Sequence, residues 1–339
     1  MSATSQAVRI LGQNGSPYSV KIRAIVRYRR LPYIWQLRDQ ELRKEVEHVK
    51  PQIIPMVQFP GDPAWRVDST PIAYEMENLF DGRSILPDDP VQRFLSDLIE
   101  DMGDEWLTKA MFHYRWFYAT DRDYASWWIA TDQLSAATTD LAERRAYARD
   151  FNDRQVGRMA LVGCTEENRP VIEESYDRVL DALEPHVGLN RFLFGTRPAL
   201  GEFGLFGQLK TLADDPTPQY EMRRRAPTVS HWIRQMDDLS GIDGDWDSPE
   251  TPLSPAVTGL LRVCGDSYLP FLAANARALE AEAEEVRLTI RDKPFAQGPF
   301  RYQGKCLARL RSLYGRLEGA AKARADAVLE ETGCLRWLA

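Results

Sequence analysis

The chain has 339 residues, of which 44% are hydrophobic and 27% are charged, the composition of a soluble globular protein with two or three domains. Its net charge of -7 argues against a nucleic-acid partner. No stretch reaches the roughly 20 apolar residues of a membrane span, and the N-terminal residues MSATSQAVRI lack the apolar centre of a signal peptide. We therefore expect a cytoplasmic protein with no membrane partner.

The first 50 residues predict two short strands, each followed by a helix. Residues 8–11 are apolar enough for a strand. A helix is expected to begin at Ser16 and Pro17, because serine caps a helix N-terminus and proline fits its first turn. Apolar and polar residues alternate over 33–37, which indicates a second strand, and residues 41–49 form a short charged helix.

Residues 51–74 combine two features that suit one ligand. Pro55 precedes the apolar run 56–59, where a proline belongs at the entrance of a strand. We expect the Ile54–Pro55 bond to be cis, and the N–H and C=O of Ile54 can then pair with a peptide-like ligand as an added strand would. Residues 68–71 (DSTP) predict a capped helix start, whose free N–H groups and dipole favour a carboxylate. Either feature alone is more often a strand edge or a simple cap.

Helices dominate the rest of the chain after a linker over 82–90. A long helix is expected from Val91 to about Trp128, followed by an amphipathic helix over 171–187 and a buried helix over 203–212. Residues 240–266 are rich in Gly, Asp and Pro and are expected to be a loop.

The C-terminal segment predicts a helical hairpin. Apolar residues recur at spacings of three and four from Leu269 to Ile290 and again from Leu307 to Val328. Two amphipathic helices separated by a short connection predict an αα-hairpin. Its two apolar seams are expected to pack on the preceding helices or on a partner subunit, because monomers seldom expose patches of that size.

Two regions of the sequence resemble the glutathione transferases. Residues 8–87 resemble the thioredoxin-like N-terminal domain of that family through Ser16-Pro17-Tyr18-Ser19, Ile54-Pro55 and Asp68-Ser69. Residues 191–203 (RFLFGTRPALGEF) look like the folding signature of the helical domain. One departure is Ala199, where the family usually has a capping Ser or Thr; Glu202, the acid three residues later, is retained.

The resemblance covers residues 8–240 and implies an α/β plus all-α fold. A thioredoxin-like glutathione-binding domain over 1–88 is expected to precede an all-helical glutathione-transferase C-terminal domain over 91–240. The helical extension over 241–339 has no counterpart in ordinary members of the family. We also expect a homodimer.

The resemblance also implies a glutathione site. Glutathione would lie along Ile54 and Pro55, with its γ-glutamyl end at Asp68 and Ser69 and its thiol near Ser16. A hydroxyl donor at a helix N-terminus favours a thiolate over a thiol, so Ser16 is the candidate catalytic residue.

Alternatives remain for the hydroxyl and for the electrophile pocket. Tyr18 and Ser19 are neighbouring hydroxyls that could replace Ser16, and the simplest alternative is that Ser16 only caps the helix. Aromatic residues crowd the region 112–128, which faces the ligand cleft in the resembled family. Tyr114, Trp116 and Tyr118 are therefore candidates for an apolar electrophile pocket, although aromatics at helical spacing are more often core.

The cysteines limit the chemistry. The four are widely scattered, which predicts neither disulfides nor a metal site. The first is Cys164, so no thiol stands at the first helix start and thiol–disulfide exchange is disfavoured. What remains is attack by the glutathione thiolate on a small apolar electrophile: conjugation, ether cleavage or isomerisation. A binding or assembly module without catalysis is the alternative function, because fold does not determine activity.

Overall fold

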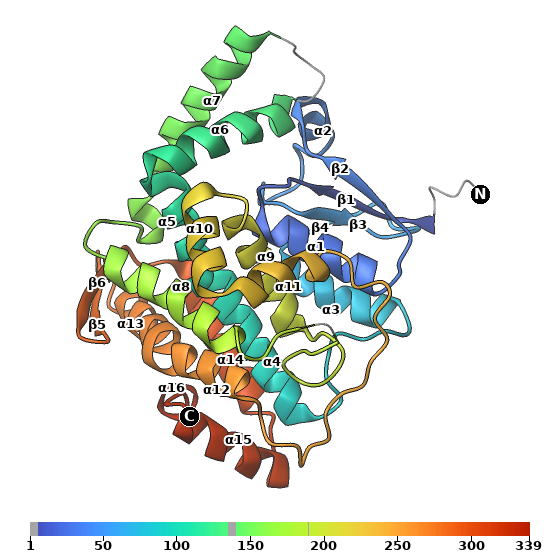
Figure 1. Ribbon diagram of the computed structural model, residues 1–339, viewed down its shortest axis with the longest axis vertical. Coiled ribbons are helices and arrows are strands. Elements are labelled where there is room, and N and C mark those ends of the chain that lie inside the picture. The colour runs from blue at the N-terminus through green and yellow to red at the C-terminus, as the bar shows by residue number, and fades with distance from the viewer. Residues whose placement is uncertain (1–5, 135–139, 189) are drawn as a thin grey trace.

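The computed structural model describes residues 6–134, 140–188 and 190–339. A small sheet domain lies beside a larger body of helices (Figure 1). The sheet has the strand order β2-β1-β3-β4, with β1 and β2 parallel and the other neighbours antiparallel. The elements of this domain are β1 (Val8–Gly12), α1 (Pro17–Tyr28), β2 (Tyr33–Leu37), α2 (Gln40–Glu45), β3 (Met56–Gln58), β4 (Trp65–Val67) and α3 (Ser69–Leu79). The predicted α/β part of the fold is confirmed.

Both faces of this sheet are covered, and the period-two pattern of the strands decides which residue faces which side. Ile10 and Val57 are fully buried in the main core, together with residues of α1 and α3. Leu11 and Met56 point the other way and pack with Val46, just after α2, in a separate small cluster. Alternate side chains of a strand point to opposite faces, so a short strand can serve two cores.

The rest of the chain is almost entirely helical, as predicted. Its first part contains α4 (Pro90–Met102), a π-helical turn (Gly103–Leu107), α5 (Thr108–Phe117), α6 (Ala119–Leu134), α7 (Leu141–Val156), a 3₁₀ turn (Ala160–Val162), α8 (Arg169–Leu183), α9 (Leu200–Leu212), α10 (Pro216–Arg225) and α11 (Pro227–Met236). The division of the whole chain at 88, 91 and 240 stays a prediction.

The prediction of a single helix from Val91 to Trp128 is wrong. The chain leaves helical geometry at Tyr118, whose ψ of 133° is extended, and α6 then starts in a new direction. Neither glycine nor proline marks this break, so the sequence pattern could not locate it. Packing of α6 against α5 and α7 stabilises the bend instead.

Helix α9 joins the sheet domain to the helical body through glycines. A Cβ atom at Gly207 would lie 2.5 Å from the carbonyl oxygen of Pro17 in α1, and one at Gly204 would lie 3.0 Å from the backbone of Glu100 in α4. Only glycine permits such close approach of two backbones. These contacts therefore set the position of the first turn of α1 relative to α4.

The start of α9 is capped without a hydroxyl. Ala199 offers no side-chain acceptor, as expected, and Glu202 accepts the backbone N–H of Ala199 at 3.1 Å and that of Leu193 at 2.5 Å. One carboxylate thus satisfies two buried donors, since Glu202 is only 1% exposed.

Glu202→Gln is expected to cost less stability at high pH than at low pH. Burial raises the pKa of the Glu202 carboxyl to about 7, against the lowering effect of its backbone N–H partners. Between the ordinary pKa and this raised value the folded chain holds a proton that the unfolded chain has released. The stability contributed by Glu202 therefore falls as pH rises through that interval. Urea unfolding should show the destabilisation by Glu202→Gln shrinking by about 2–3 kcal/mol from about pH 5 to about pH 8.

The control for this experiment is Glu41→Gln, a change at an exposed position of α2. Its effect on the free energy of unfolding should be small at both pH values. A destabilisation by Glu202→Gln that does not vary with pH would contradict the raised pKa of the Glu202 carboxyl.

The C-terminal segment is more complex than the predicted αα-hairpin. It consists of α12 (Pro255–Val263), a π-helical turn (Cys264–Tyr268), α13 (Leu269–Glu280), β5 (Val286–Ile290), β6 (Lys293–Gln297), α14 (Arg301–Tyr314), α15 (Gly319–Glu331) and α16 (Leu335–Leu338). The loop expected over 240–266 contains α12, and the helix expected over 269–290 ends at Glu280. Helices α13 and α14 pack against each other as predicted for a hairpin, but the segment that connects them in the sequence forms the β-hairpin β5–β6.

The sequence analysis missed strand β5 because the spacing of its buried residues fits both a helix and a strand. Val286 and Ile290 are each 1% exposed, and residues four apart suit a helical stripe as well as one face of a strand. Arg291 and Asp292 decide between the two, because their φ values of 47° and 62° turn the chain into an antiparallel hairpin.

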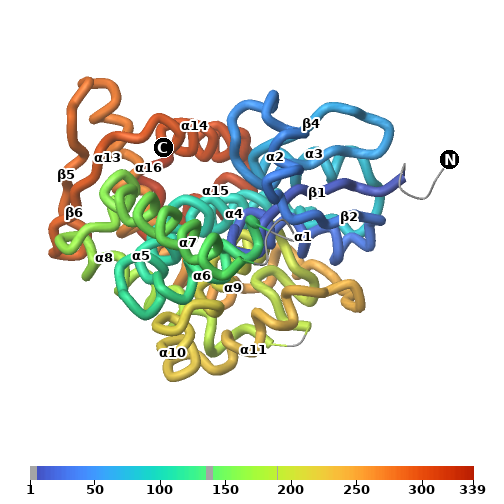
Figure 2. Tube along the Cα trace, turned by 90° about the horizontal axis from the view of Figure 1, so that it is seen from above, coloured from blue at the N-terminus to red at the C-terminus, as the bar shows by residue number. Residues whose placement is uncertain are grey.

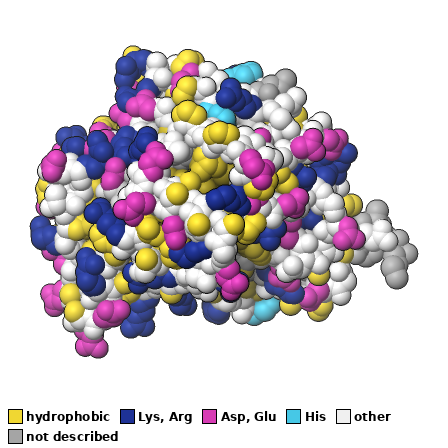
Figure 3. All heavy atoms as spheres, turned by 90° about the horizontal axis from the view of Figure 1, so that it is seen from below, with side chains coloured by type: hydrophobic (Ala, Val, Ile, Leu, Met, Phe, Trp, Pro, Cys, Tyr) yellow, Lys and Arg dark blue, Asp and Glu magenta, His cyan; other side chains and the backbone are white. Residues whose placement is uncertain are grey.

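Helix α14 brings the extension back to the sheet domain. Figure 2 shows it lying between that domain and the C-terminal elements. On the face seen in Figure 3, side chains of both charges are intermingled with apolar ones. Within the described residues, no helix combines the length and the apolar character needed to cross a bilayer.

Candidate functional site

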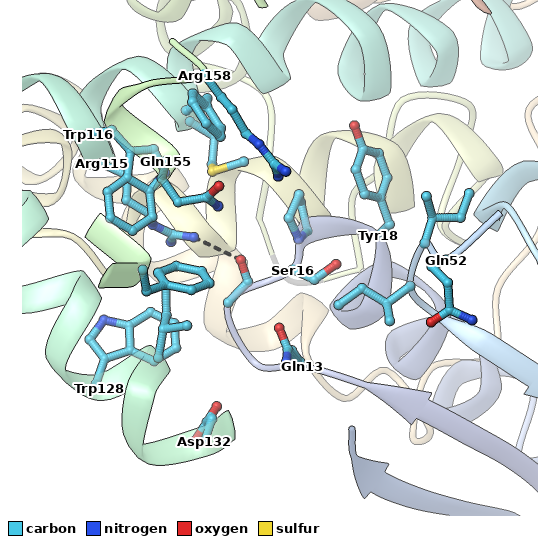
Figure 4. Close-up of a pocket in the computed structure, with 18 residues that line it drawn as sticks. Gln13, Ser16, Tyr18, Gln52, Arg115, Trp116, Trp128, Asp132, Gln155 and Arg158 are labelled. Atoms are coloured by element: carbon cyan, nitrogen blue, oxygen red, sulfur yellow. Dashed lines mark hydrogen bonds between the residues drawn. The ribbon is translucent and has the colours of Figure 1, made fainter. Parts of the chain in front are cut away.

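A cavity of about 540 Å³ lies between the sheet domain and the helices α5, α6 and α7 (Figure 4). We call it the aromatic cavity, because Phe112, Trp116, Trp128 and Phe151 line it on the helical side. The sheet-domain side consists of the loop before α1, the first turn of α1 and residues 52–54, and it includes the polar side chains of Gln13, Ser16 and Gln52. Ligand cavities commonly combine apolar walls with a few polar groups in this way.

Ser16 is both a helix cap and part of the cavity wall. Its Oγ accepts the backbone N–H of Ser19 at 3.3 Å, and the side chain is half-buried. The preceding carbonyl, that of Gly15, accepts a hydrogen bond from Nη1 of Arg115 at 2.8 Å. Nε of Arg115 in turn donates to Asp215 at 2.7 Å. This buried arginine therefore holds the loop in which Ser16 lies.

The two alternative hydroxyls lie in different surroundings. The Tyr18 hydroxyl donates to the backbone carbonyl of Asp104 at 3.0 Å, and burial raises the pKa of Tyr18 well above its usual value. Its ring nevertheless lines the aromatic cavity. Ser19 is fully buried, and its Oγ has no hydrogen-bond partner among the described residues. Ser16 is therefore the serine hydroxyl that lines this cavity.

A second cavity, of about 310 Å³, lies at the start of α3. We call it the acidic cavity, since Asp68, Asp101, Asp104 and Glu105 all line it. Residues of the C-terminal segment, Phe300 and Tyr302, also line it. Tyr18, Ile53 and Ile54 line both cavities, so the two adjoin along Ile54.

The Ile54–Pro55 peptide bond is cis, as predicted. Strand β3 begins only at Met56, and neither the N–H nor the C=O of Ile54 has a hydrogen-bond partner among the described residues. Pro55 is buried, whereas Ile54 is half-buried. Ile54 thus offers a free donor and a free acceptor at the boundary between the cavities.

Asp68 and Ser69 begin α3 as predicted, and each has a partner. Asp68 has a φ of 76°, and its Oδ1 accepts the backbone N–H of Thr70 at 3.4 Å. Its other oxygen, Oδ2, accepts the hydroxyl of Tyr302 at 2.8 Å. Ser69 is 3% exposed, and its Oγ donates to Asp104 at 3.3 Å. The Ser69 backbone N–H has no partner among the described residues.

A buried charge network that the sequence analysis missed supports this helix start. Nζ of Lys21 in α1 donates to Glu100 at 2.5 Å and to Asp104 at 2.6 Å. Burial raises the pKa of Asp104 to about 7, although Lys21 opposes that shift. The signal was visible in part, because Lys21 interrupts the apolar face of α1.

Of the three aromatic candidates, Trp116 lines the aromatic cavity. Tyr114 is buried against Tyr176 instead, and the Tyr118 hydroxyl donates to Glu173 at 2.5 Å. Neither tyrosine belongs to the lining of either cavity. Their helical spacing produced core contacts, which was the more common alternative.

The cysteines and acidic groups form no further site. Cys164, Cys264, Cys306 and Cys334 are all buried and unpaired. Among residues 6–134, 140–188 and 190–339, no group of three His, Cys, Asp or Glu side chains is arranged to hold a metal ion.

Comparison with known proteins finds similar structures but no matching family model and no curated relative. The beta-etherase LigF from Sphingobium sp. strain SYK-6 is 15% identical with a TM-score of 0.47, over 68% of this chain and 95% of that one. A glutathione S-transferase from Methylobacterium radiotolerans, in complex with glutathione sulfonate, is 16% identical with a TM-score of 0.43, over 73% and 99%. The Tau class glutathione S-transferase from mango is 18% identical with a TM-score of 0.35, over 68% and 88%.

The topology of the chain itself comprises a βαβ unit, then a β-hairpin that a cis proline precedes, and then an almost entirely helical body. By the order of its own elements, the chain consists of a thioredoxin-like α/β domain followed by an almost entirely helical body.

Proposed function

We propose that the protein is a glutathione transferase-like enzyme. It binds glutathione across the boundary of the two cavities and activates the thiol for attack on an electrophile in the aromatic cavity. The observation that carries the proposal is the position of Ile54. Its unpaired N–H and C=O lie where the cavity that Ser69 lines adjoins the cavity that Ser16 lines.

The acidic cavity suits the γ-glutamyl end of glutathione, which carries one ammonium and one carboxylate group. The free N–H of Ser69, at the N-terminus of α3, is a donor for the carboxylate. The carboxylates of Asp68 and Asp104 face the same space and are partners for the ammonium. The peptide backbone of glutathione would then run past Ile54 and Pro55 toward α1.

Ser16 acts on the thiol at the other end. A free thiol has a pKa of about 8.5, so most of it is protonated at neutral pH. The Ser16 hydroxyl can donate to a thiolate, and the N-terminus of α1 adds a favourable dipole. The proton leaves to water, and the sulfur attacks the electrophilic carbon. Conjugation, ether cleavage and isomerisation all begin with this step.

A binding module without catalysis is the second candidate, and one contact favours it. Tyr302, from the C-terminal segment, already bonds the Asp68 carboxylate that glutathione would use. In a binding module, Tyr302 of the C-terminal segment would keep its hydrogen bond to Asp68, and glutathione would not bind in the acidic cavity. Turnover of any glutathione-dependent reaction separates the two candidates.

The proposal also includes the localisation, oligomeric state, domain division and partners of the enzyme. We expect a cytoplasmic homodimer with the domains 1–88, 91–240 and 241–339, acting on a small electrophile and using glutathione as co-substrate without a metal. Neither a nucleic acid nor a membrane is expected as a partner.

Asp68→Asn is expected to weaken glutathione binding about tenfold, because an ammonium loses its charged partner. Asparagine tolerates the positive φ at this position and keeps an oxygen for the Thr70 N–H, so the helix start should persist. Isothermal titration of the full chain with glutathione measures the change. The matched control is Asp81→Asn, which removes an exposed acid just beyond the other end of α3.

The wild-type chain should bind one glutathione per chain, and Asp81→Asn should bind it equally well. An absence of binding by the wild-type chain would contradict the proposal and favour the binding module. Equal affinity of the wild type and Asp68→Asn would remove Asp68 from the site.

A further inference from the structure

The aromatic cavity contains a cation that no described residue neutralises. Arg158 lies in the turn after α7, is exposed and lines the cavity. Figure 4 shows its guanidinium group pointing into the cavity. No hydrogen bond or ion pair joins that group to another residue of the described part of the chain. A free guanidinium is a strong, planar donor for a carboxylate.

The other charged groups of the cavity are already paired. Arg115 uses Nε for Asp215, Nη1 for the Gly15 carbonyl and Nη2 for the Thr211 carbonyl. Asp132 accepts a hydrogen bond from Asn14 at 3.0 Å, and Figure 4 shows it at the opposite side of the cavity from Arg158. Arg158 is therefore the lining charge, within the described residues, that is left for a ligand.

The walls of the aromatic cavity add a second requirement for the ligand, besides a charge that pairs with Arg158. Phe112, Trp116, Trp128 and Phe151 present aromatic surface, and Met111 and Ile129 also line the cavity. A volume of about 540 Å³ holds a molecule of one or two rings. Aromatic side chains bind flat rings through stacked and edge-to-face contacts.

We infer that the electrophile is an aromatic molecule that carries a carboxylate, with its ring between the aromatic walls and its carboxylate on Arg158. This inference rests on the proposed function, since it names the acceptor of the thiolate. A purely apolar electrophile, which the sequence suggested, would leave Arg158 without a partner. The charge therefore distinguishes the aromatic carboxylates from neutral aromatic electrophiles.

A suitable probe is 4-chloro-3-nitrobenzoate, with its neutral methyl ester as the comparison. In the reaction, the glutathione thiolate forms a C–S bond at the ring carbon that carries chlorine, the C–Cl bond breaks, and chloride leaves with the bonding electrons. The proton of the thiol has already passed to water. No oxidant or further reactant is needed, and binding of both probes can be measured without glutathione.

The test compares the dissociation constants of the two probes, measured by quenching of tryptophan fluorescence in the full chain. Arg158→Gln should raise the constant for the carboxylate about tenfold relative to that for the ester. Added salt should weaken binding of the carboxylate to the wild type and shift the ester much less. The matched control is Arg149→Gln, which removes an exposed arginine of α7 that does not line the cavity.

The outcomes separate this inference from the proposed function. The inference would be overturned if Arg158→Gln left the ratio of the two dissociation constants unchanged, or if Arg149→Gln changed that ratio equally. It would also be overturned if the wild type failed to bind the carboxylate. A loss of glutathione affinity in Arg158→Gln would also overturn it, because the arginine would then serve glutathione itself. Failure of the proposed function shows differently: the carboxylate still binds through Arg158, but the wild type binds no glutathione.

Discussion

Ser16→Ala is expected to slow glutathione-dependent turnover at neutral pH by about ten- to a hundredfold. The variant removes the hydroxyl that donates to the thiolate, so the pKa of the bound thiol rises and less thiolate is present. Binding of glutathione should barely change, since Ile54, Asp68 and Ser69 are untouched. Steady-state rates measured over a range of pH should show the loss shrinking toward high pH, where the thiol ionises unaided.

Ser16 also caps α1, which allows the two roles to be separated. Loss of the cap alone should cost about 1 kcal/mol of stability and leave turnover nearly intact. Ser19→Ala is the control, because Ser19 is buried and lines neither cavity. Ser16→Cys should form a mixed disulfide with glutathione, since a thiol at a helix N-terminus is acidified. Full turnover in Ser16→Ala, together with its loss in Tyr18→Phe, would transfer the role to Tyr18.

Lys21→Met is expected to lower the free energy of unfolding by about 3–5 kcal/mol. Lys21 and Glu100 are fully buried, and Asp104 is nearly so. Methionine fills a similar volume but removes the cation closest to both buried acids, and Glu100 then has Arg309 at 4.0 Å as its remaining ion-pair partner. Urea unfolding followed by circular dichroism measures the change.

Lys44→Met is the matched control for this prediction. Lys44 pairs with Glu41 at 2.7 Å, but both side chains are largely exposed, so the pair should contribute about 0.5 kcal/mol or less. A similarly small effect of Lys21→Met would show that water reaches the Lys21 network. Lys21→Arg keeps the charge and should lose less stability than Lys21→Met if the charge, rather than the packing, is what matters.

The sequence by itself determined the local elements of the sheet domain. Ser16 and Pro17 start α1, Asp68 caps α3, and the bond before Pro55 is cis, all as predicted. Caps and prolines act within a few residues of themselves, so a sequence pattern can locate them.

Local patterns failed where two structures share one spacing. Residues 286–290 fit a helical stripe and a strand equally well, and only the turn at Arg291 and Asp292 decides for the strand. The break at Tyr118 lacks any local signal and depends on how α6 packs. In both cases contacts between elements outweigh the preference of the segment.

Only the tertiary structure decided the composition of the candidate site. Tyr302 reaches Asp68 across 234 residues of sequence, and Lys21 pairs with Glu100 in α4 and with Asp104 in the π-helical turn that follows it. The free charge of Arg158 is equally invisible in the sequence, because it depends on which acids lie within reach. Pairing of charges and the shape of a cavity are properties of the packed molecule. The sequence could therefore predict the residues that start helices, while only the fold decides which side chains meet around Ile54.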